Sequence, residues 1–88
     1  MRARVAPRYR VLLHNDPLTP FDFVIGILRN IFGKGMAEAV RITFEAHTGQ
    51  IALVGVLALE EAEARNERAH GLARTREHPL TFTIEPET

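Results

Sequence analysis

The stretch HNDPLTPFDF, residues 14–23, gathers polar side chains whose types could bind a ligand. It joins an alternating apolar run, YRVLL, to a run typical of a helix, FVIGILRNIF. Asparagine and aspartate oxygens accept hydrogen bonds, so Asn15 and Asp16 suit a ligand that donates them. The same residue types are also ordinary turn residues after a strand. Phe21 either lines a pocket beside them or covers the core, and these residues alone leave both interpretations open.

The four histidines, at positions 14, 47, 70 and 78, are the other candidates for chemistry. No two of them are four residues apart, so no helical histidine pair is predicted to hold a metal. The sequence has no cysteine and no glycine-rich phosphate-binding motif, and we expect neither metal nor cofactor. His47 falls on the apolar stripe of a predicted helix, where a histidine is either a structural residue or a ligand contact. We expect His70 on a helix surface and His78 in a loop.

The residues do not favour an enzyme. A small hydrolase could use His47 with Asp16, but the chain offers no cysteine as a nucleophile. The candidate hydroxyl groups, on Thr19 and Thr43, already have structural interpretations. We therefore expect a protein that binds rather than catalyses.

Composition places the chain among ordinary globular domains. It has 88 residues, 45% of them hydrophobic, with 11 Lys+Arg against 11 Asp+Glu. This length predicts one domain. The zero net charge gives no bulk attraction to nucleic acid or to anionic membranes. No apolar segment has the roughly 20 residues of a membrane span, and the basic start lacks the apolar run of a signal peptide. We expect a cytoplasmic monomer.

The elements that must position these residues follow from apolar periodicity. Alternating apolar side chains from Tyr9 to His14 predict a strand. Thr19 suits a helix N-cap, Pro20 the first helical position, and Asp22 the negative charge favoured at a helix start. Four apolar residues at helical spacing then form one face, and GKG at 33–35 ends the helix. These four residues are Val24, Ile27, Leu28 and Ile31.

The second half of the chain continues the pattern. A helix is predicted over about Met36–His47, closed by Gly49, and the apolar run 50–57 predicts a strand. A third helix fits Leu59–Arg74, and a last strand follows from Leu80 to Ile84. The buried side of the third helix is predicted to include Leu59, Ala62, Ala69, Leu72 and Ala73.

The element order is therefore β-α-α-β-α-β. It predicts an α+β fold, a compact single domain with three helices packed on a small three-stranded antiparallel sheet. We expect residues 1–7 to form a short flexible N-terminal arm and residues 8–88 to form the domain.

The sequence resembles the ClpS family, the adaptors that bring N-degron substrates to the Clp protease. The resemblance rests on YRVLLHND followed by TPFDFVIGIL, on EAH at 45–47 and VGV at 54–56, and on EEAE at 60–63 and EHPLTFTIE at 77–85. It covers about residues 8–86. It implies the β-α-α-β-α-β fold that periodicity predicts independently.

The resemblance also implies roles for the residues left open above. Asn15 and His47 would hydrogen-bond the free α-amino group of the substrate, and Asp16 is the nearest carboxylate. The side chain of the N-terminal residue, large and hydrophobic (Leu, Phe, Tyr or Trp), would enter an apolar pocket. The positions that match the family's pocket are Leu18, Thr19, Phe21, Val24, Thr43, Ala46 and Leu80.

The sequence departs from the family pattern at several of these positions. Pro17 replaces the family's second aspartate, and Phe21 and Thr43 replace two methionines that gate the pocket. Ala46 replaces the usual valine before the histidine. Because Thr43 and Ala46 are small and Phe21 is bulky and stiff, we expect a reshaped pocket and a changed selectivity.

The resemblance implies a protein partner as well. Glu60 and Arg65 match the family's docking surface for the N-terminal domain of a Clp AAA+ unfoldase, ClpA- or ClpC-like; without the resemblance they indicate only a solvated helix face. The first hypothesis is thus an adaptor that passes N-degron substrates to this unfoldase. The second is a divergent ClpS-like module with altered selectivity, or a regulator of the unfoldase that does not deliver. Pro17, Thr43 and the short arm favour the second.

Overall fold

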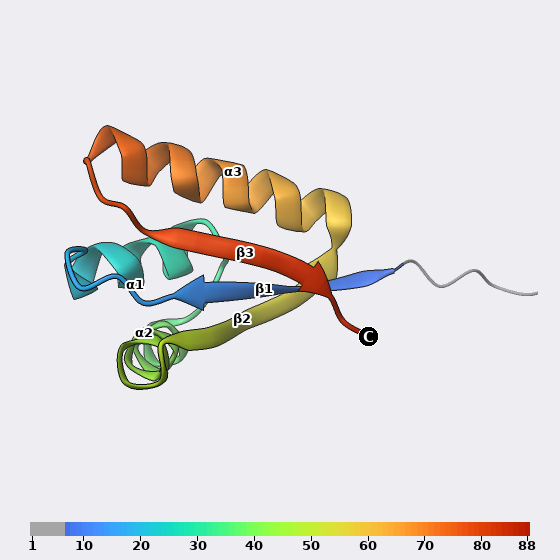
Figure 1. The fold of residues 1–88 in the computed structure, drawn as a ribbon, viewed down its shortest axis with the longest axis horizontal. Helices are drawn as coiled ribbons and strands as arrows, with labels where there is room; N and C mark the ends of the chain where they lie inside the picture. The colour runs from blue at the N-terminus through green and yellow to red at the C-terminus, as the bar shows by residue number, and fades with distance from the viewer. Residues whose placement is uncertain (1–6) are drawn as a thin grey trace, which may run out of the picture.

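A computed structural model describes residues 7–88, and its elements follow one another in the predicted order, β-α-α-β-α-β (Figure 1). The predicted N-terminal arm, except Pro7, lies outside the described residues. The elements are β1 Arg8–His14, α1 Phe21–Asn30, α2 Met36–Gly49, β2 Ile51–Ala58, α3 Leu59–Thr75 and β3 Thr81–Pro86. The predicted fold class is confirmed.

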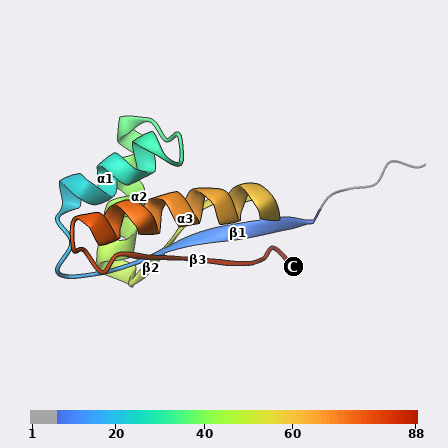
Figure 2. The ribbon, with the colours of Figure 1, turned by 90° about the horizontal axis from the view of Figure 1, so that it is seen from above.

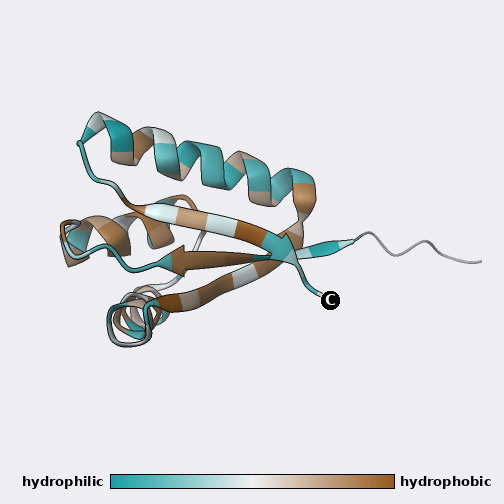
Figure 3. Cartoon of the chain, viewed as in Figure 1, coloured by the Kyte–Doolittle hydropathy of each residue, from teal (hydrophilic) through white to brown (hydrophobic). Residues whose placement is uncertain are grey.

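The three strands form one antiparallel sheet in the order β2-β1-β3. Leu13 of the central strand pairs with Ala52 on one side and with Phe82 on the other, and all three side chains are buried. The helices lie together on one side of the sheet (Figure 2). Apolar residues dominate β2 and the second half of β1, whereas α3 shows mostly hydrophilic residues (Figure 3). The alternation of β1 therefore sends Val11 and Leu13 into the core beneath the helices.

Helix α1 buries its predicted apolar stripe, but it begins differently from the prediction. Val24, Ile27 and Leu28 are buried, and the N-cap is Pro20, which makes no side-chain capping bond. The Thr19 hydroxyl donates to the Asp16 carboxylate, so Thr19 closes the preceding loop and does not cap the helix. A short Thr side chain can serve either purpose, and here the carboxylate is the acceptor.

Helix α2 extends beyond its predicted end, because Gly49, which was predicted to close the helix, is still part of it. Gly49 is the last helical residue, and Gln50 takes the left-handed conformation, with φ 77°. The backbone N–H of Gln50 donates to the Ala46 carbonyl over 2.8 Å, and its own carbonyl accepts from the N–H of Asn15, also over 2.8 Å. The end of α2 is thereby tied to the loop that follows β1.

Helix α3 is bound to β3 through two polar side chains that the sequence analysis did not place there. The Asn66 amide donates to the Phe82 carbonyl over 3.3 Å, and His70 Nε2 accepts the Phe82 N–H over 2.9 Å. Asn66 is buried, and His70 is half-buried and not on the open surface as predicted. Leu59 and Leu72, both predicted to be buried, are 37% and 41% exposed. Because both polar backbone groups of Phe82 bond to α3, the helix covers the outer edge of β3 at this residue.

Within residues 7–88, no helix has the length and apolar character that crossing a membrane requires.

Candidate functional site

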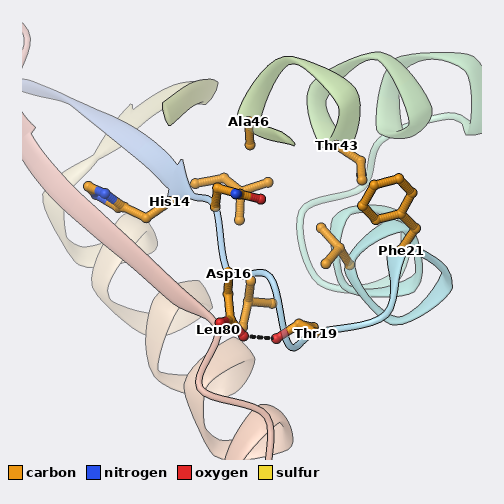
Figure 4. A pocket seen from close by; sticks show the side chains of 10 residues that line it. His14, Asp16, Thr19, Phe21, Thr43, Ala46 and Leu80 are labelled. Atoms are coloured by element: carbon orange, nitrogen blue, oxygen red, sulfur yellow. Dashed lines mark hydrogen bonds between the residues drawn. The ribbon is translucent and has the colours of Figure 1, made fainter. Parts of the chain in front are cut away.

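A small cavity opens where the end of β1, the loop before α1 and the second half of α2 meet (Figure 4). Its volume is about 10 Å³, room for about one water molecule. Most of its wall is apolar, and its polar residues come from the segment 14–19 and from Thr43 of α2. The lining residues are Leu13, His14, Asn15, Asp16, Thr19, Phe21, Val24, Thr43, Ala46 and Leu80.

The cavity gathers most of the predicted pocket residues. Of that set, Leu18 alone does not line it: its side chain is 75% exposed in the loop before α1. Leu18 lies outside this cavity because the hydrogen bonds of the Asp16 loop turn Thr19 inward and leave Leu18 exposed. Sequence reasoning missed Leu13, although its alternation places it as the last buried residue before the loop. It also missed His14, whose ring points away from the cavity and meets Thr83 Oγ1 at 2.7 Å (Figure 4).

Asn15 is held at the cavity through its backbone. Its N–H bond to the Gln50 carbonyl places it beside the last turn of α2, and it lines the cavity together with Ala46 of that turn. The side chain of Asn15 is not needed for this bond. Asn15 is thereby placed on the cavity wall by a bond that leaves the carbonyl and amide groups of its side chain unused.

His47 stands at the rim of the cavity and not on its wall. Its side chain is exposed, and its ring lies edge-on to Phe21, with 5.0 Å between ring centroids. Phe21 lines the cavity, as does Ala46, the chain neighbour of His47. The fold thus brings Asn15 and His47, which are distant in sequence, to the same cavity, one on the wall and one at the rim.

Asp16 shapes the loop and supplies the negative charge of the wall. One carboxylate oxygen accepts the Leu18 N–H over 3.4 Å, and the other accepts the Thr19 hydroxyl (Figure 4). This is the turn geometry expected of an aspartate after a strand. A carboxylate has about four acceptor sites, so these two bonds leave it able to accept more. Asp16 is the acidic side chain among the lining residues.

The α2 side of the cavity is built from small side chains. Thr43 is 3% exposed and Ala46 is 2% exposed. The Thr43 hydroxyl donates to the Ala39 carbonyl of the preceding turn over 2.8 Å, so its donor is already used. The ring of Phe21 lies next to Thr43, on α1 (Figure 4). The large Phe21 ring of α1 therefore faces small side chains on α2.

No group of three or more His, Asp or Glu side chains in residues 7–88 is arranged to hold a metal ion. The polar groups of the cavity can accept hydrogen bonds and present negative charge. Together with the apolar wall, they suit a ligand that has a cationic donor at one end and an apolar group at the other.

The structure does not bring the two predicted docking residues into one hollow. Glu60 is exposed in the first turn of α3 and borders a hollow of about 290 Å³ with Tyr9 and Leu59. Arg65 is half-buried: it donates to Glu61 at 2.9 Å and to the Ile31 carbonyl at the end of α1. Arg65 thus has a structural task, which joins α3 to α1, whereas Glu60 is free of ion pairs among the described residues.

Comparison with known proteins places this arrangement in a family. A family model described as ATP-dependent Clp protease adaptor protein ClpS matches residues 4–83. The ATP-dependent Clp protease adapter protein ClpS of Desulfatibacillum aliphaticivorans is 39% identical over 79 residues, 90% of this chain and 76% of that protein. The ClpS of Roseobacter denitrificans is 41% identical over 81 residues, 92% of this chain and 72% of that protein.

A solved structure is similar over nearly the whole fold. The structure of Agrobacterium tumefaciens ClpS2 bound to L-phenylalaninamide matches with a TM-score of 0.90 at 34% sequence identity, covering 94% of this chain and all of that one, 100%. Sequence and fold thus agree over most of the chain, and the predicted resemblance is confirmed. The chain belongs to the ClpS family of ATP-dependent Clp protease adaptor proteins.

Proposed function

We propose that this adaptor binds the free α-amino group and the large hydrophobic side chain of an N-terminal residue, and passes such N-degron substrates to a Clp AAA+ unfoldase. The observation that carries the proposal is one cavity that is lined mostly by apolar residues, with Asn15 and Asp16 among its lining residues and His47 at its rim. The ligand of the similar ClpS2 supports it, because phenylalaninamide has an α-amino group and an aromatic side chain.

The polar side chains at the cavity match an ammonium group. An ammonium has three N–H donors and one positive charge, so its site must offer acceptors and favour the charge. The Asn15 carbonyl oxygen and one ring nitrogen of His47 supply two acceptors. Asp16 supplies the charge, since Pro17 leaves no second carboxylate in the loop. An N-acetylated residue would bring one donor and no charge, and the site would reject it.

Entry of a side chain requires the wall to move. A volume of about 10 Å³ does not hold an isobutyl or benzyl group. Phe21 is the wall residue best placed to swing aside, because it is 39% exposed and contacts the exposed side chains of Phe44 and His47, whereas Thr43 and Ala46 are buried. The buried Thr43 and Ala46 leave more room behind it than larger side chains would. We infer that Phe21 is the gate of the pocket.

The same wall residues, Phe21, Thr43 and Ala46, favour a second candidate function. A stiff aromatic gate opposite two small side chains fits a pocket whose ranking of N-terminal residues differs from the usual one. In this version the domain still binds free N-termini, but its selectivity among Leu, Phe, Tyr and Trp is shifted, or it regulates the unfoldase without delivery.

The series that tests the proposal consists of labelled peptides that differ only at residue one: Phe, Leu, Tyr, Trp, Ile, Val, Arg and Gly. Fluorescence anisotropy should show binding of the large hydrophobic group and none of Arg or Gly. The order within the group decides between the usual and the shifted selectivity. Equal binding of all eight, or none, would refute an N-degron pocket.

A further inference from the structure

An exposed aromatic surface adjoins the mouth of the cavity. It consists of the rings of Phe21, Phe44 and His47, here called the aromatic rim. Phe44 is 49% exposed, and its ring centroid lies 5.2 Å from that of Phe21 and 6.5 Å from that of His47, both in edge-on geometry. Phe44 does not line the cavity. The rim thus extends the apolar wall outward onto the surface of α2.

The burial of Phe44 does not explain its presence. It follows the buried Thr43 directly in α2 and makes no part of the core, so half of its ring faces solvent. Its helix neighbour Arg41 is bridged to Glu38 at 3.0 Å and to Glu45 at 2.6 Å, so one positive and two negative charges lie beside it and their sum is negative. The result is an exposed apolar surface that continues from the cavity and lies beside a net negative charge.

The proposed binding mode directs the ligand across this surface. With the α-amino group at Asn15 and His47 and the first side chain in the cavity, the rest of the peptide must leave past the mouth. His47 and Phe21, which border that mouth, both contact Phe44. The side chain of the second residue is therefore the first ligand group that can cover the exposed ring.

We propose that the aromatic rim is a subsite for the second residue of the bound peptide and that it selects an apolar side chain there, aromatic best. This inference rests on the proposed function. An aromatic or branched side chain can stack on the half-exposed ring of Phe44, whereas an acidic one would meet the negative face of its π-system. Pairing with an aromatic ring corresponds to about a three- to ten-fold gain in affinity.

The test uses peptides that begin with Phe and carry Ala, Leu, Phe or Asp at position two. The protein is compared with its Phe44→Ala variant and with Met36→Ala, which removes an apolar side chain of similar exposure, 52%, from the other end of α2. We expect the wild type and Met36→Ala to bind the Leu and Phe peptides about three- to ten-fold more tightly than the Ala peptide. Phe44→Ala should bind all of them like the Ala peptide.

A Phe44→Leu variant guards against loss of folding, since it keeps an apolar side chain. It should retain the preference for Leu at position two and lose the additional gain from Phe. Binding of the Ala peptide without any effect of position two, or an unchanged preference in Phe44→Ala, would overturn the subsite and leave the proposed function intact. Failure of every Phe peptide to bind would overturn both.

Discussion

The backbone N–H of Asn15 donates to the carbonyl oxygen of Gln50 over 2.8 Å, and this bond joins the loop after β1 to the end of α2 at the candidate site. Gln50 follows α2 directly and carries the left-handed turn that ends it. The loop that bears Asn15 and Asp16 is thereby fixed against the helix that bears Thr43, Ala46 and His47. Since the bond uses only main-chain atoms, the side chain of Asn15 is available to a ligand without a structural duty.

Because the backbone of Asn15 makes the structural bond and its side chain is left to a ligand, we expect a substitution at Asn15 to weaken binding without unfolding the domain. Asn15→Ala keeps the N–H bond to Gln50, so the melting temperature should stay close to that of the wild type. Loss of an acceptor for a charged donor should weaken binding of a Phe-starting peptide about ten- to hundred-fold. Asn30→Ala, at the exposed end of α1, is the matched control. Unchanged affinity of the Asn15 variant would show that its side chain takes no part in binding.

The small side chains of α2 predict how selectivity can be changed. Ala46→Val adds two methyl groups to a wall residue that is 2% exposed, so it narrows the pocket opposite the loop. Peptides that begin with Trp or Phe should lose about ten-fold in affinity relative to one that begins with Leu. Overpacking should also cost about 1–3 kcal/mol of stability, which urea unfolding would measure. An unchanged ratio between Trp and Leu peptides would mean that Ala46 does not limit the pocket.

His70 predicts a pH dependence of stability. Burial, and next the neighbouring Arg74 guanidinium, lower the pKa of His70 below its ordinary value of 6.5. The folded chain therefore prefers the neutral ring, whose Nε2 accepts the Phe82 N–H, while the unfolded chain binds the proton near pH 6.5. The contribution of His70 is present above this pH and is lost as the pH falls below it.

The measurement is urea unfolding at pH 8 and at pH 5. His70→Gln provides a side-chain oxygen that can accept the same N–H but does not titrate, so this variant should lose less stability than the wild type between the two pH values. His70→Ala should be less stable than both at pH 8. If all three proteins lose the same stability on acidification, His70 does not act as a titrating link between α3 and β3.

Substitutions of Glu60 and of Arg65 should affect stability differently, although the family resemblance assigned both residues to one docking surface. Glu60→Lys changes an exposed charge in the first turn of α3, so stability should fall by less than about 1 kcal/mol. Binding to the purified N-terminal domain of a Clp unfoldase should weaken. Arg65→Met removes the bonds to Glu61 and to the Ile31 carbonyl and should cost about 1–2 kcal/mol of stability. Full unfoldase binding by Glu60→Lys would exclude this face as the docking site.

Local patterns predicted the parts of this structure that depend on neighbours in sequence. The alternation around Val11 and Leu13 and the helical spacing of Val24, Ile27 and Leu28 place the core correctly, because burial of an apolar face decides those elements. Residue type and position made Asn15 and His47 candidates, but only the family resemblance assigned to both a role in binding an α-amino group. Nothing local distinguishes a binding asparagine from a turn asparagine.

Two errors of the sequence-based prediction concern polar side chains that can bond either to a local partner or to a distant one. Thr19 has the sequence context of an N-cap but bonds to Asp16, and the same loop turns Leu18 outward. His70 has the spacing of a surface residue but bonds to Phe82 on a strand formed later in the chain. In both cases the deciding contact depends on the tertiary arrangement or on loop geometry, which periodicity does not encode.

The central claim is that the site binds a free α-amino group together with a hydrophobic side chain. Titration calorimetry with a Phe-starting peptide and with its N-acetylated form tests it most directly, because the two ligands share every apolar group. We predict saturable one-to-one binding of the free peptide and a loss of at least about a hundred-fold in affinity on acetylation, since a single uncharged donor replaces three donors and a positive charge. Equal affinity for the two peptides would contradict the account: the cavity would then bind a hydrophobic side chain wherever it occurs, and Asn15 and His47 would have no part in recognising the N-terminus.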